Sequence, residues 1–520
     1  MSGKCRKIMY ALVVTVFAAF LWMICCENDR KVSDKAIGET TVQSMRSGEK
    51  TVSLEQSDIP KIEIEDLTDA FTVILQYAPK DMLAGCTVDE SFLMWFYAQY
   101  GRDAVIHIAF DVLDGGNDPD VWYEETGNSI HVLWLLYCRD SGFGQHELEN
   151  VYWMQTAAAS EMVFGFAGDI NFAENWYTTE YMKEQPDGLW DCFSEDLLAQ
   201  MQGIDVMIMN NEFTYVNKKG ATSVYGKAYT FRADPQKAEL LEIFGTDTVT
   251  LANNHVYDYG KRGLLSTLDA LDQEGIPYSG AGRNLKDASK IIYYVMNGRK
   301  VAFVSATQIE RSKQYTKAAT ETEPGVLKAL HPEKFLKIVK EAAQNSDYVI
   351  AEVHWGTEGM LYPDQSQRHL AEQIAQAGAD VIIGGHPHRL QGTTFVGDVP
   401  IAYSLGNFWF STGTLYTTLA KVTITEDGTV KLSFVPCIQQ NLTTRILTEP
   451  EEQSDFYEYL ASVSMDIGID ADGVVYNKNA DDYPAGEILY DSDTSQTDII
   501  GMADNEGDAI DIVGNLREDR

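Results

Sequence analysis

The sequence predicts an α/β fold, and two observations carry that prediction. Seven short apolar runs recur between residues 162 and 406, and each stops at glycine or a polar residue. Segments with helical periodicity lie between them. This alternation is typical of a sheet whose strands are joined by helices. The runs read MVFGFAG, IDVMIMN, DTVTLAN, VAFVSAT, YVIAEVH, ADVIIGG and PIAYSLG.

The N-terminus predicts a membrane anchor over residues 1–27. Basic residues (Lys4, Arg6, Lys7) precede an uncharged run from Ile8 to Cys26, which is long enough to cross a bilayer core as a helix. Basic sequence before the run and acidic sequence after it favour a single-pass protein of the cell membrane whose remaining chain is extracellular. A buried helix of a soluble protein would keep a polar face, which this run lacks.

Lipid attachment is the alternative to an uncleaved anchor. Cys25 and Cys26 close the apolar run, but bulky Trp22, Met23 and Ile24 stand where lipoprotein cleavage needs small residues. We therefore favour the signal anchor.

Two segments separate the anchor from the strand-rich region. Residues 28–60 are polar and almost free of aromatic residues, as in a flexible linker. Residues 61–158 mix helical and β-like segments rich in aromatic residues, such as DESFLMWFYAQYG and SIHVLWLLYC. We expect a small accessory α/β region there.

Residues 159–450 form the predicted main domain. Leu264, Leu268 and Leu271 share one face of a helix that stops at Gly275. Residues 421–437 alternate as two strands around the turn EDGT. A C-terminal extension over 451–520 adds one more helix-like stretch and an acidic tail.

Polar residues collect where five of the predicted strands end. In open α/β sheets the carboxyl ends of the strands line the ligand crevice, so these side chains should converge. They are Asp169 and Asn171, Asn211 and Glu212, Asn253 to His255, His354, and finally His386 and His388.

The chemistry of this set predicts a divalent metal centre. Carboxylates, amide oxygens and imidazoles without thiolates suit Mn²⁺, Fe²⁺ or Zn²⁺. The donors exceed what one tetrahedral ion needs, and two ions bridged by Glu212 would use them all and would suit displacement at phosphorus. We expect Gly384 and Gly385 to let the backbone turn sharply, so that His386 and His388 face different metals.

Each residue also has a structural interpretation when it is taken alone. A single histidine after a strand is more often a hydrogen-bonded structural residue, and Asp169 or Asn254 suits a helix cap. The metal hypothesis depends on the five strand ends together.

Five motifs in matching order resemble the CapA family of poly-γ-glutamate capsule biosynthesis proteins, across about residues 162–440. They begin with FAGDINF, NNEFTY and LANNHVYDYG, and continue with VHWGTEG through GGHPHRLQG and IAYSLGNFWF. That family is similar to calcineurin-like metallophosphoesterases. The resemblance implies a four-layer α-β-β-α sandwich of the metallophosphoesterase type.

The resemblance also implies roles for the polar residues. Asp169 and His388 would join Glu212 at one metal, and Asn254, His354 and His386 would join Glu212 at the other. His255 would act as general acid, with Asn171 and Asn211 as nearby polar contributors. Two positions depart from the phosphoesterase pattern, which has His where this chain has Asn171 and Asp where it has Glu212.

The charge balance restricts the partners. Acidic residues outnumber basic ones by 78 to 40, and the net charge of −38 excludes nucleic acid as a natural partner. We regard Arg232 and Arg283 as candidate groups for an anionic substrate, although each also suits a structural role.

Two functional hypotheses follow. One is an anchored, outward-facing metal-dependent hydrolase that acts on a phosphoester, or on an amide of a capsule or cell-envelope polymer, poly-γ-glutamate being the expected one. The other is a non-catalytic binding or assembly component that works with membrane synthase or export subunits on that polymer.

Overall fold

The computed structural model describes residues 67–80, 82–116, 118–219, 221–311 and 313–492. The predicted anchor, the predicted linker and most of the acidic tail lie outside these residues. Contacts divide the chain into a unit that ends at Asp58 and a second that begins at Ile59. Within the described part of the chain, no helix is both long and apolar enough to cross a membrane.

Two seven-stranded mixed sheets form the centre of the second unit, and the predicted mixed α/β fold is confirmed. The first has the order β20-β19-β18-β2-β4-β7-β8, and the second has the order β1-β10-β11-β13-β14-β16-β15. In the first sheet β2 (Glu161–Ala167), β4 (Val206–Asn210), β7 (Thr246–Thr250) and β8 (Tyr278–Ser279) run parallel. In the second, β11 (Arg299–Thr307), β13 (Tyr348–His354), β14 (Val381–Gly385) and β16 (Val399–Ala402) do so.

Antiparallel strands complete both sheets. The hairpin expected around EDGT exists: β18 (Leu415–Thr425) pairs with β19 (Val430–Gln440), and β18 also pairs with β2. The remaining strands of the two sheets are β20 (Thr443–Ile446), β1 (Val151–Trp153), β10 (Ile292–Met296) and β15 (Thr393–Val396). Short strands outside them are β3 (Asp169–Ile170), β5 (Thr214–Tyr215), β6 (Arg232–Ala233), β9 (Ala281–Gly282), β12 (Gly325–Val326) and β17 (Asn407–Trp409).

One apolar cluster lies between the two sheets, and a further cluster packs on the other face of each. Phe164 and Phe166 of β2 share the central cluster with Phe303 of β11 and Ile350 of β13. Neighbouring residues such as Val349 face the opposite way, because successive strand residues point to opposite faces.

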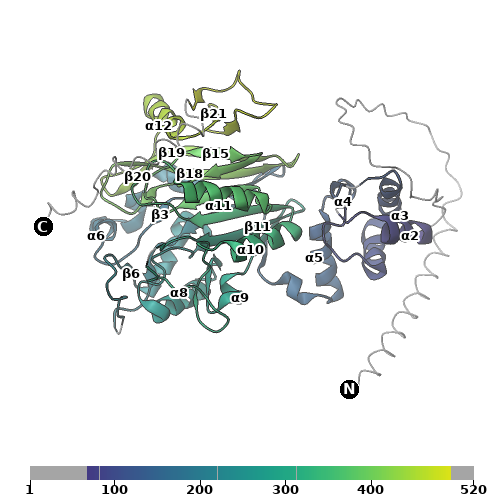
Figure 1. Ribbon diagram of the computed structural model, residues 1–520, viewed down its shortest axis with the longest axis horizontal. Coiled ribbons are helices and arrows are strands. Elements are labelled where there is room, and N and C mark those ends of the chain that lie inside the picture. The colour runs from purple at the N-terminus through teal and green to yellow at the C-terminus, as the bar shows by residue number, and fades with distance from the viewer. Residues whose placement is uncertain (1–66, 81, 117, 220, 312, 493–520) are drawn as a thin grey trace. The chain divides into compact units, whose positions relative to one another are not determined.

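Helices cover these outer faces. On the second sheet, α10 (Glu333–Gln344) and α11 (Gln365–Gln376) contribute Phe335 and Leu370 to the outer cluster, and Figure 1 shows both helices beside its strands. On the first sheet lie α7 (Glu195–Gln202), α8 (Gly260–Glu274) and the 3₁₀ helix η3 (Pro235–Phe244). The leucine face predicted for α8 is buried there, and Gly275 ends the helix. Shorter helices are α6 (Tyr177–Glu184), η2 (Gly188–Cys192) and α9 (Leu285–Ala288).

The described part of the predicted accessory region, residues 61–158, is mostly helical, and β1 is its strand. The described elements are α2 (Leu67–Tyr77), α3 (Glu90–Leu113, interrupted at Gly101), α4 (Asp120–Thr126), α5 (Ile130–Ser141) and η1 (Gln145–Leu148). Both quoted segments form helices: DESFLMWFYAQYG begins α3, capped by Asp89, and SIHVLWLLYC forms α5, capped by Ser129. Burial on several sides explains the run of apolar residues in α5, which resembles a strand pattern.

A hydrogen-bonded seam joins this helical region to the second sheet. Asp347 accepts from Ser129 Oγ and from the Lys300 backbone N–H, each at 2.6 Å. Arg299 pairs with Asp120 at 2.5 Å. Three chain segments therefore meet at the Asp347 carboxylate.

At the C-terminus, α12 (Pro450–Val463) is the helix-like stretch expected after residue 450. A small sheet follows, which was not predicted, formed by β21 (Ile467–Ile469), β22 (Val475–Asn477) and β23 (Tyr490–Asp491). The boundaries predicted at residues 158 and 450 stay predictions.

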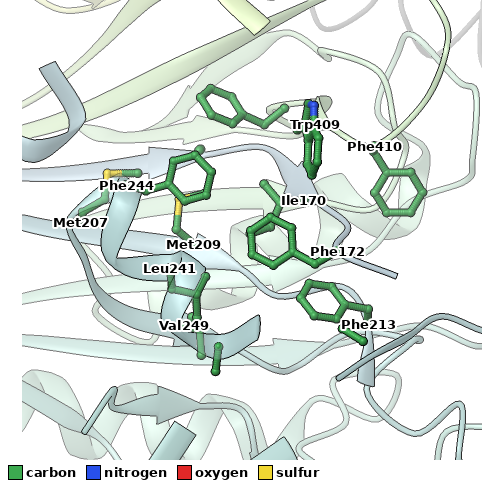
Figure 2. Packing of buried hydrophobic residues seen from close by; sticks show 14 of the residues in the cluster. Ile170, Phe172, Met207, Met209, Phe213, Leu241, Phe244, Val249, Trp409 and Phe410 are labelled. Atoms are coloured by element: carbon green, nitrogen blue, oxygen red, sulfur yellow. The ribbon is translucent and has the colours of Figure 1, made fainter. Parts of the chain in front are cut away.

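The outer apolar cluster of the first sheet packs against the segments that carry two of the predicted metal ligands. Figure 2 shows Ile170, Phe172, Phe213 and Trp409 gathered in the outer cluster of the first sheet. The ring centroid of Phe172 lies 5.4 Å from that of Phe213 and 5.9 Å from that of Trp409. Ile170 directly follows Asp169 and Phe213 directly follows Glu212 in the sequence, so the cluster fixes the backbone that carries both carboxylates.

The seam at Asp347 predicts a pH-dependent stability. Burial raises the pKa of Asp347 from its ordinary value near 3.8 to about 6, although the hydrogen bonds from Ser129 and Lys300 oppose the shift. Between about pH 4 and pH 6 the folded protein holds more protons than the unfolded chain, so its free energy of unfolding falls as pH rises. We expect Asp347→Asn to remove up to about 3 kcal/mol of that fall in the free energy of unfolding, since one pKa unit corresponds to about 1.36 kcal/mol.

Urea unfolding of the wild type and the variant at pH 4, 5, 6 and 7 measures this difference. Asp481→Asn, at an exposed aspartate, is the matched control. An unchanged pH slope in Asp347→Asn would contradict the assignment.

Candidate metal centre

The carboxyl ends of strands from both sheets meet at one place. Asp169 lies in β3, directly beyond β2, and Glu212 follows β4 by two residues. Asn254 follows β7, His354 ends β13, and His386 directly follows β14. A parallel bridge between Ile170 and Asn211 holds the first two segments together, and β3 also pairs with β17.

The structure brings the predicted metal-binding residues together as two overlapping groups. One contains Asp169, Glu212 and His388, and the other contains Glu212, His354 and His386, with ligand atoms within 4.8 Å of one another in each group. Glu212 belongs to both, as a bridging carboxylate would. Asn254 joins the second group, because its Oδ1 lies 2.8 Å from His354 Nε2.

Both carboxylates are buried with oxygen atoms that lack donors. Glu212 is fully buried and neither of its carboxylate oxygens has a hydrogen-bond partner, and Oδ2 of Asp169 has none either. His354 Nε2 lies 3.3 Å from Glu212 Oε1, and His388 Nδ1 lies 3.1 Å from Asp169 Oδ2. Buried unpaired charge is costly unless a cation compensates it, so these residues fit divalent ions.

The pKa directions follow from this burial. Burial, and next the Asp169 charge, raises the pKa of Glu212 well above its usual value. Burial lowers the pKa of His386 far below normal and that of His354 to about 3, which keeps both imidazoles neutral and able to bind metal. Burial alone would lower the pKa of His388, but Glu212 and Asp169 raise it to about 10.

The two glycines act differently from the expectation. Neither Gly384 nor Gly385 has a positive φ, whereas His386 and His388 do, at 100° and 56°. The glycines provide space: a Cβ on Gly384 would lie 2.1 Å from the Tyr403 carbonyl oxygen, and one on Gly385 would lie 3.3 Å from Asp169 Oδ1. The strained turn is therefore made by the histidines themselves, a conformation that persists where the surroundings enforce it.

His255 directly follows Asn254 in the sequence, and its ring is held by a hydrogen bond to Asp258. Its Nδ1 lies 2.8 Å from Asp258 Oδ2, which leaves Nε2 as its free ring nitrogen. Burial lowers the pKa of His255, although Asp258 opposes the shift. Lys227 donates to the other oxygen of Asp258 at 2.6 Å. The ring of Phe231 packs 4.4 Å from that of His255.

The remaining predicted residues have other contacts. Asn171 is buried with Oδ1 accepting from the Ala173 N–H, and Asn211 donates to the Phe213 carbonyl. Arg232 pairs with Glu174, and Arg283 pairs with Asp269 and Asp272. Among the described residues neither arginine has an ion pair or hydrogen bond with the histidine cluster.

Several supporting residues were missed in the sequence. Asn407 Oδ1 lies 2.8 Å from His388 Nδ1, and because an amide oxygen only accepts, the imidazole donates there and directs Nε2 towards Glu212. Asn210 donates to Asp169 Oδ1 at 2.6 Å. Asn210 ends the apolar run IDVMIMN, and Asn407 directly follows the run PIAYSLG. A search for polar residues at the end of every predicted strand would have found both. Glu358, which forms a third group with His386 and His388, had no such signal.

Comparison with known proteins identifies the segment that carries this site. Residues 163–412 match the family model described as bacterial capsule synthesis protein PGA_cap. The resemblance to the CapA family is confirmed. The CapA-like segment contains all the predicted metal-binding residues and His255.

The CapA-like segment also accounts for the similarity to curated relatives. The capsule biosynthesis protein CapA of Bacillus anthracis is 34% identical over 223 residues, which are 42% of this chain and 53% of that protein. The PGA biosynthesis protein CapA of Bacillus subtilis is 34% identical over 214 residues, with 40% and 55% covered. A probable polyglutamine synthesis accessory protein of Mycobacterium tuberculosis is 27% identical over 188 residues, with 35% and 50% covered. The chain thus spans about half the length of these relatives.

Two solved structures show weak overall similarity. A phosphatase from Mycoplasma pneumoniae has a TM-score of 0.35 at 13% identity, with 58% of this chain and 99% of that chain covered. The 5′-nucleotidase of Candida albicans has a TM-score of 0.31 at 11% identity, with 55% and 54% covered.

The site predicts metal-dependent stability. We expect Mn²⁺ to raise the melting temperature of the wild type, because a ligand at about 100 times its Kd stabilises the folded state by about 2.7 kcal/mol per site. Glu212→Gln should lose both ions, since Glu212 belongs to both groups, and His386→Ala should lose one. Metal analysis of the purified full chain, together with thermal unfolding, measures both effects.

His369→Ala is the matched control, because His369 is an exposed histidine whose ion-pair partner is Glu372, a neighbour on α11. Two ions retained in Glu212→Gln would contradict the shared ligand.

Proposed function

We propose that this chain is a CapA-like protein of capsule or cell-envelope polymer biosynthesis with a two-metal centre that performs hydrolysis or transfer at a phosphoester or amide. One observation carries the proposal: Asp169 and Glu212 are buried with unpartnered oxygens where three histidines converge. A four-layer α-β-β-α sandwich of the metallophosphoesterase type is the finer fold that this proposal includes.

The residues divide between two ions. Asp169, His388 and Glu212 would hold one ion, and His354, His386, Asn254 and Glu212 would hold the other. Oxygen and imidazole donors without thiolate favour Mn, Fe or Zn. The first ion has fewer protein ligands, because the Asn171 side chain accepts a hydrogen bond from its own loop.

Bound ions of this kind activate water and stabilise negative charge on the reacting group. The side chains of the protein would supply the proton and the enclosure. His255, held at Nδ1 by Asp258, would donate a proton from Nε2 to the leaving group. Phe410 packs 4.6 Å from His388 and 5.4 Å from Phe231, so aromatic rings flank both histidines and limit access of water.

The relatives support a polymer pathway. Their names refer to capsule, PGA and polyglutamine synthesis, and an anionic polymer such as poly-γ-glutamate is the substrate class we propose. A γ-amide bond is suited to the same metal chemistry as a phosphoester. We further propose that residues 1–27 anchor the protein in the cell membrane with the CapA-like segment outside, beside synthase or export subunits.

The relative from M. tuberculosis is named an accessory protein, which favours a second candidate function. In this second function, the centre of the present chain binds metal and polymer without turnover and helps to assemble or export the polymer. Measurements of turnover separate the two functions.

His255 provides the test of catalysis. We expect His255→Ala to keep its metal and its melting temperature, and to lower hydrolysis of a simple alkyl phosphodiester by about 10²-fold or more, because general acid catalysis contributes about 10² to 10⁴. Hydrolysis of a p-nitrophenyl diester should fall much less, since its leaving group needs no proton. Steady-state rates with both substrates measure the difference.

Equal losses with the two substrates would exclude the general-acid role. A wild type that binds two metals but cleaves neither diesters nor poly-γ-glutamate would instead favour the assembly function.

A further inference from the structure

Glu358 is an exposed carboxylate beside two predicted metal-binding histidines, of which His386 is buried and His388 is partly buried. It lies four residues beyond His354, on the loop that leaves β13. One carboxylate oxygen and a ring nitrogen from each of His386 and His388 lie within 4.8 Å of one another. Those imidazoles belong to different predicted metals, so Glu358 spans the two positions.

The backbone holds Glu358 in place. The Gly359 N–H donates to the Pro387 carbonyl at 2.8 Å, and the Trp355 N–H donates to the Gly385 carbonyl at 3.1 Å. These bonds attach both ends of the short loop to the turn that carries His386 and His388. A structural role does not account for the side chain, because among the described residues its carboxylate has no hydrogen bond or ion pair.

The burial pattern shows which side of the centre is open. Asp169, Glu212, His354 and His386 are each at most 5% exposed, whereas Glu358 is exposed. A substrate therefore approaches from the side where Glu358 stands. His386 Nδ1 is buried and lacks a hydrogen-bond partner, which is independent evidence that this histidine holds a ligand.

We propose that Glu358 is an exchangeable ligand on the open side of the metal centre, and that an anionic phosphate or carboxylate group of the substrate displaces it. The inference rests on the proposed two-metal function. Glu212 bridges the ions from the buried side, and Glu358 completes their coordination from the solvent side when no substrate is bound. The ion held by Asp169, Glu212 and His388 would gain most from this added ligand. Asn171 adds little to its coordination, because its Oδ1 accepts a hydrogen bond from the Ala173 N–H.

The test compares wild type, Glu358→Gln and Glu358→Asp as purified full chains in detergent. Calorimetry measures the Kd for Mn²⁺ and, on the Mn²⁺-loaded protein, the Kd for inorganic phosphate. We expect Glu358→Gln to weaken the weaker Mn²⁺ site about tenfold and to bind phosphate several-fold more tightly, because phosphate no longer displaces a ligand. Glu372→Gln is the matched control, at an exposed glutamate of α11.

Glu358→Asp separates ligation from charge. Its shorter side chain keeps the charge but loses reach, so Mn²⁺ binding should weaken as in Glu358→Gln. Mn²⁺ binding unchanged in both variants would overturn the proposal, whatever the phosphate result. If Glu358→Gln weakens Mn²⁺ binding but leaves phosphate binding unchanged or weaker, Glu358 is a fixed ligand. That result would overturn its displacement by an anionic group. A wild type without bound Mn²⁺ would overturn the proposed function itself, which is a distinct result.

Discussion

The site depends on two carboxylates that are buried where the protein provides too few hydrogen-bond donors. Asp169 Oδ1 accepts a hydrogen bond from Asn210, while Asp169 Oδ2 and both oxygens of Glu212 lack hydrogen-bond partners. Burial of such groups opposes folding unless they are compensated, and His388, with its raised pKa, compensates only part of the charge. Two divalent cations would remove the imbalance, so metal binding and stability of this region are coupled.

The rest of the fold supplies the rigidity that this burial requires. The residues next to the carboxylates, Ile170 and Phe213, pack in the outer cluster of the first sheet with Phe172 and Trp409. His354 and His386 come from the other sheet, and the central cluster fixes one sheet against the other. The candidate metal-binding atoms thus come from two sheets joined by a packed interior, whose dense packing resists small displacements.

The strand ends could be predicted from sequence because apolar runs stop where polar ligands begin, and that rule located Asp169, Glu212, Asn254, His354 and His386. Local geometry could not. Gly384 and Gly385 suggested a sharp backbone turn, but the positive φ angles belong to His386 and His388. The glycines instead allow close approach to Tyr403 and Asp169. Glu358 ends no strand, and only the folded loop places it by the histidines.

The cations near the site indicate how an anion would be held. Lys227 pairs with Asp258 and Glu310, Arg311 pairs with Asp364, and the candidates Arg232 and Arg283 also have acidic partners. Paired side chains add little attraction for a polyanion, and the net charge of −38 repels one. Metal ions bound at the proposed centre would supply that attraction. In this protein, polymer binding and catalysis would share one dependence on divalent ions, and turnover rather than binding distinguishes an enzyme from an assembly factor.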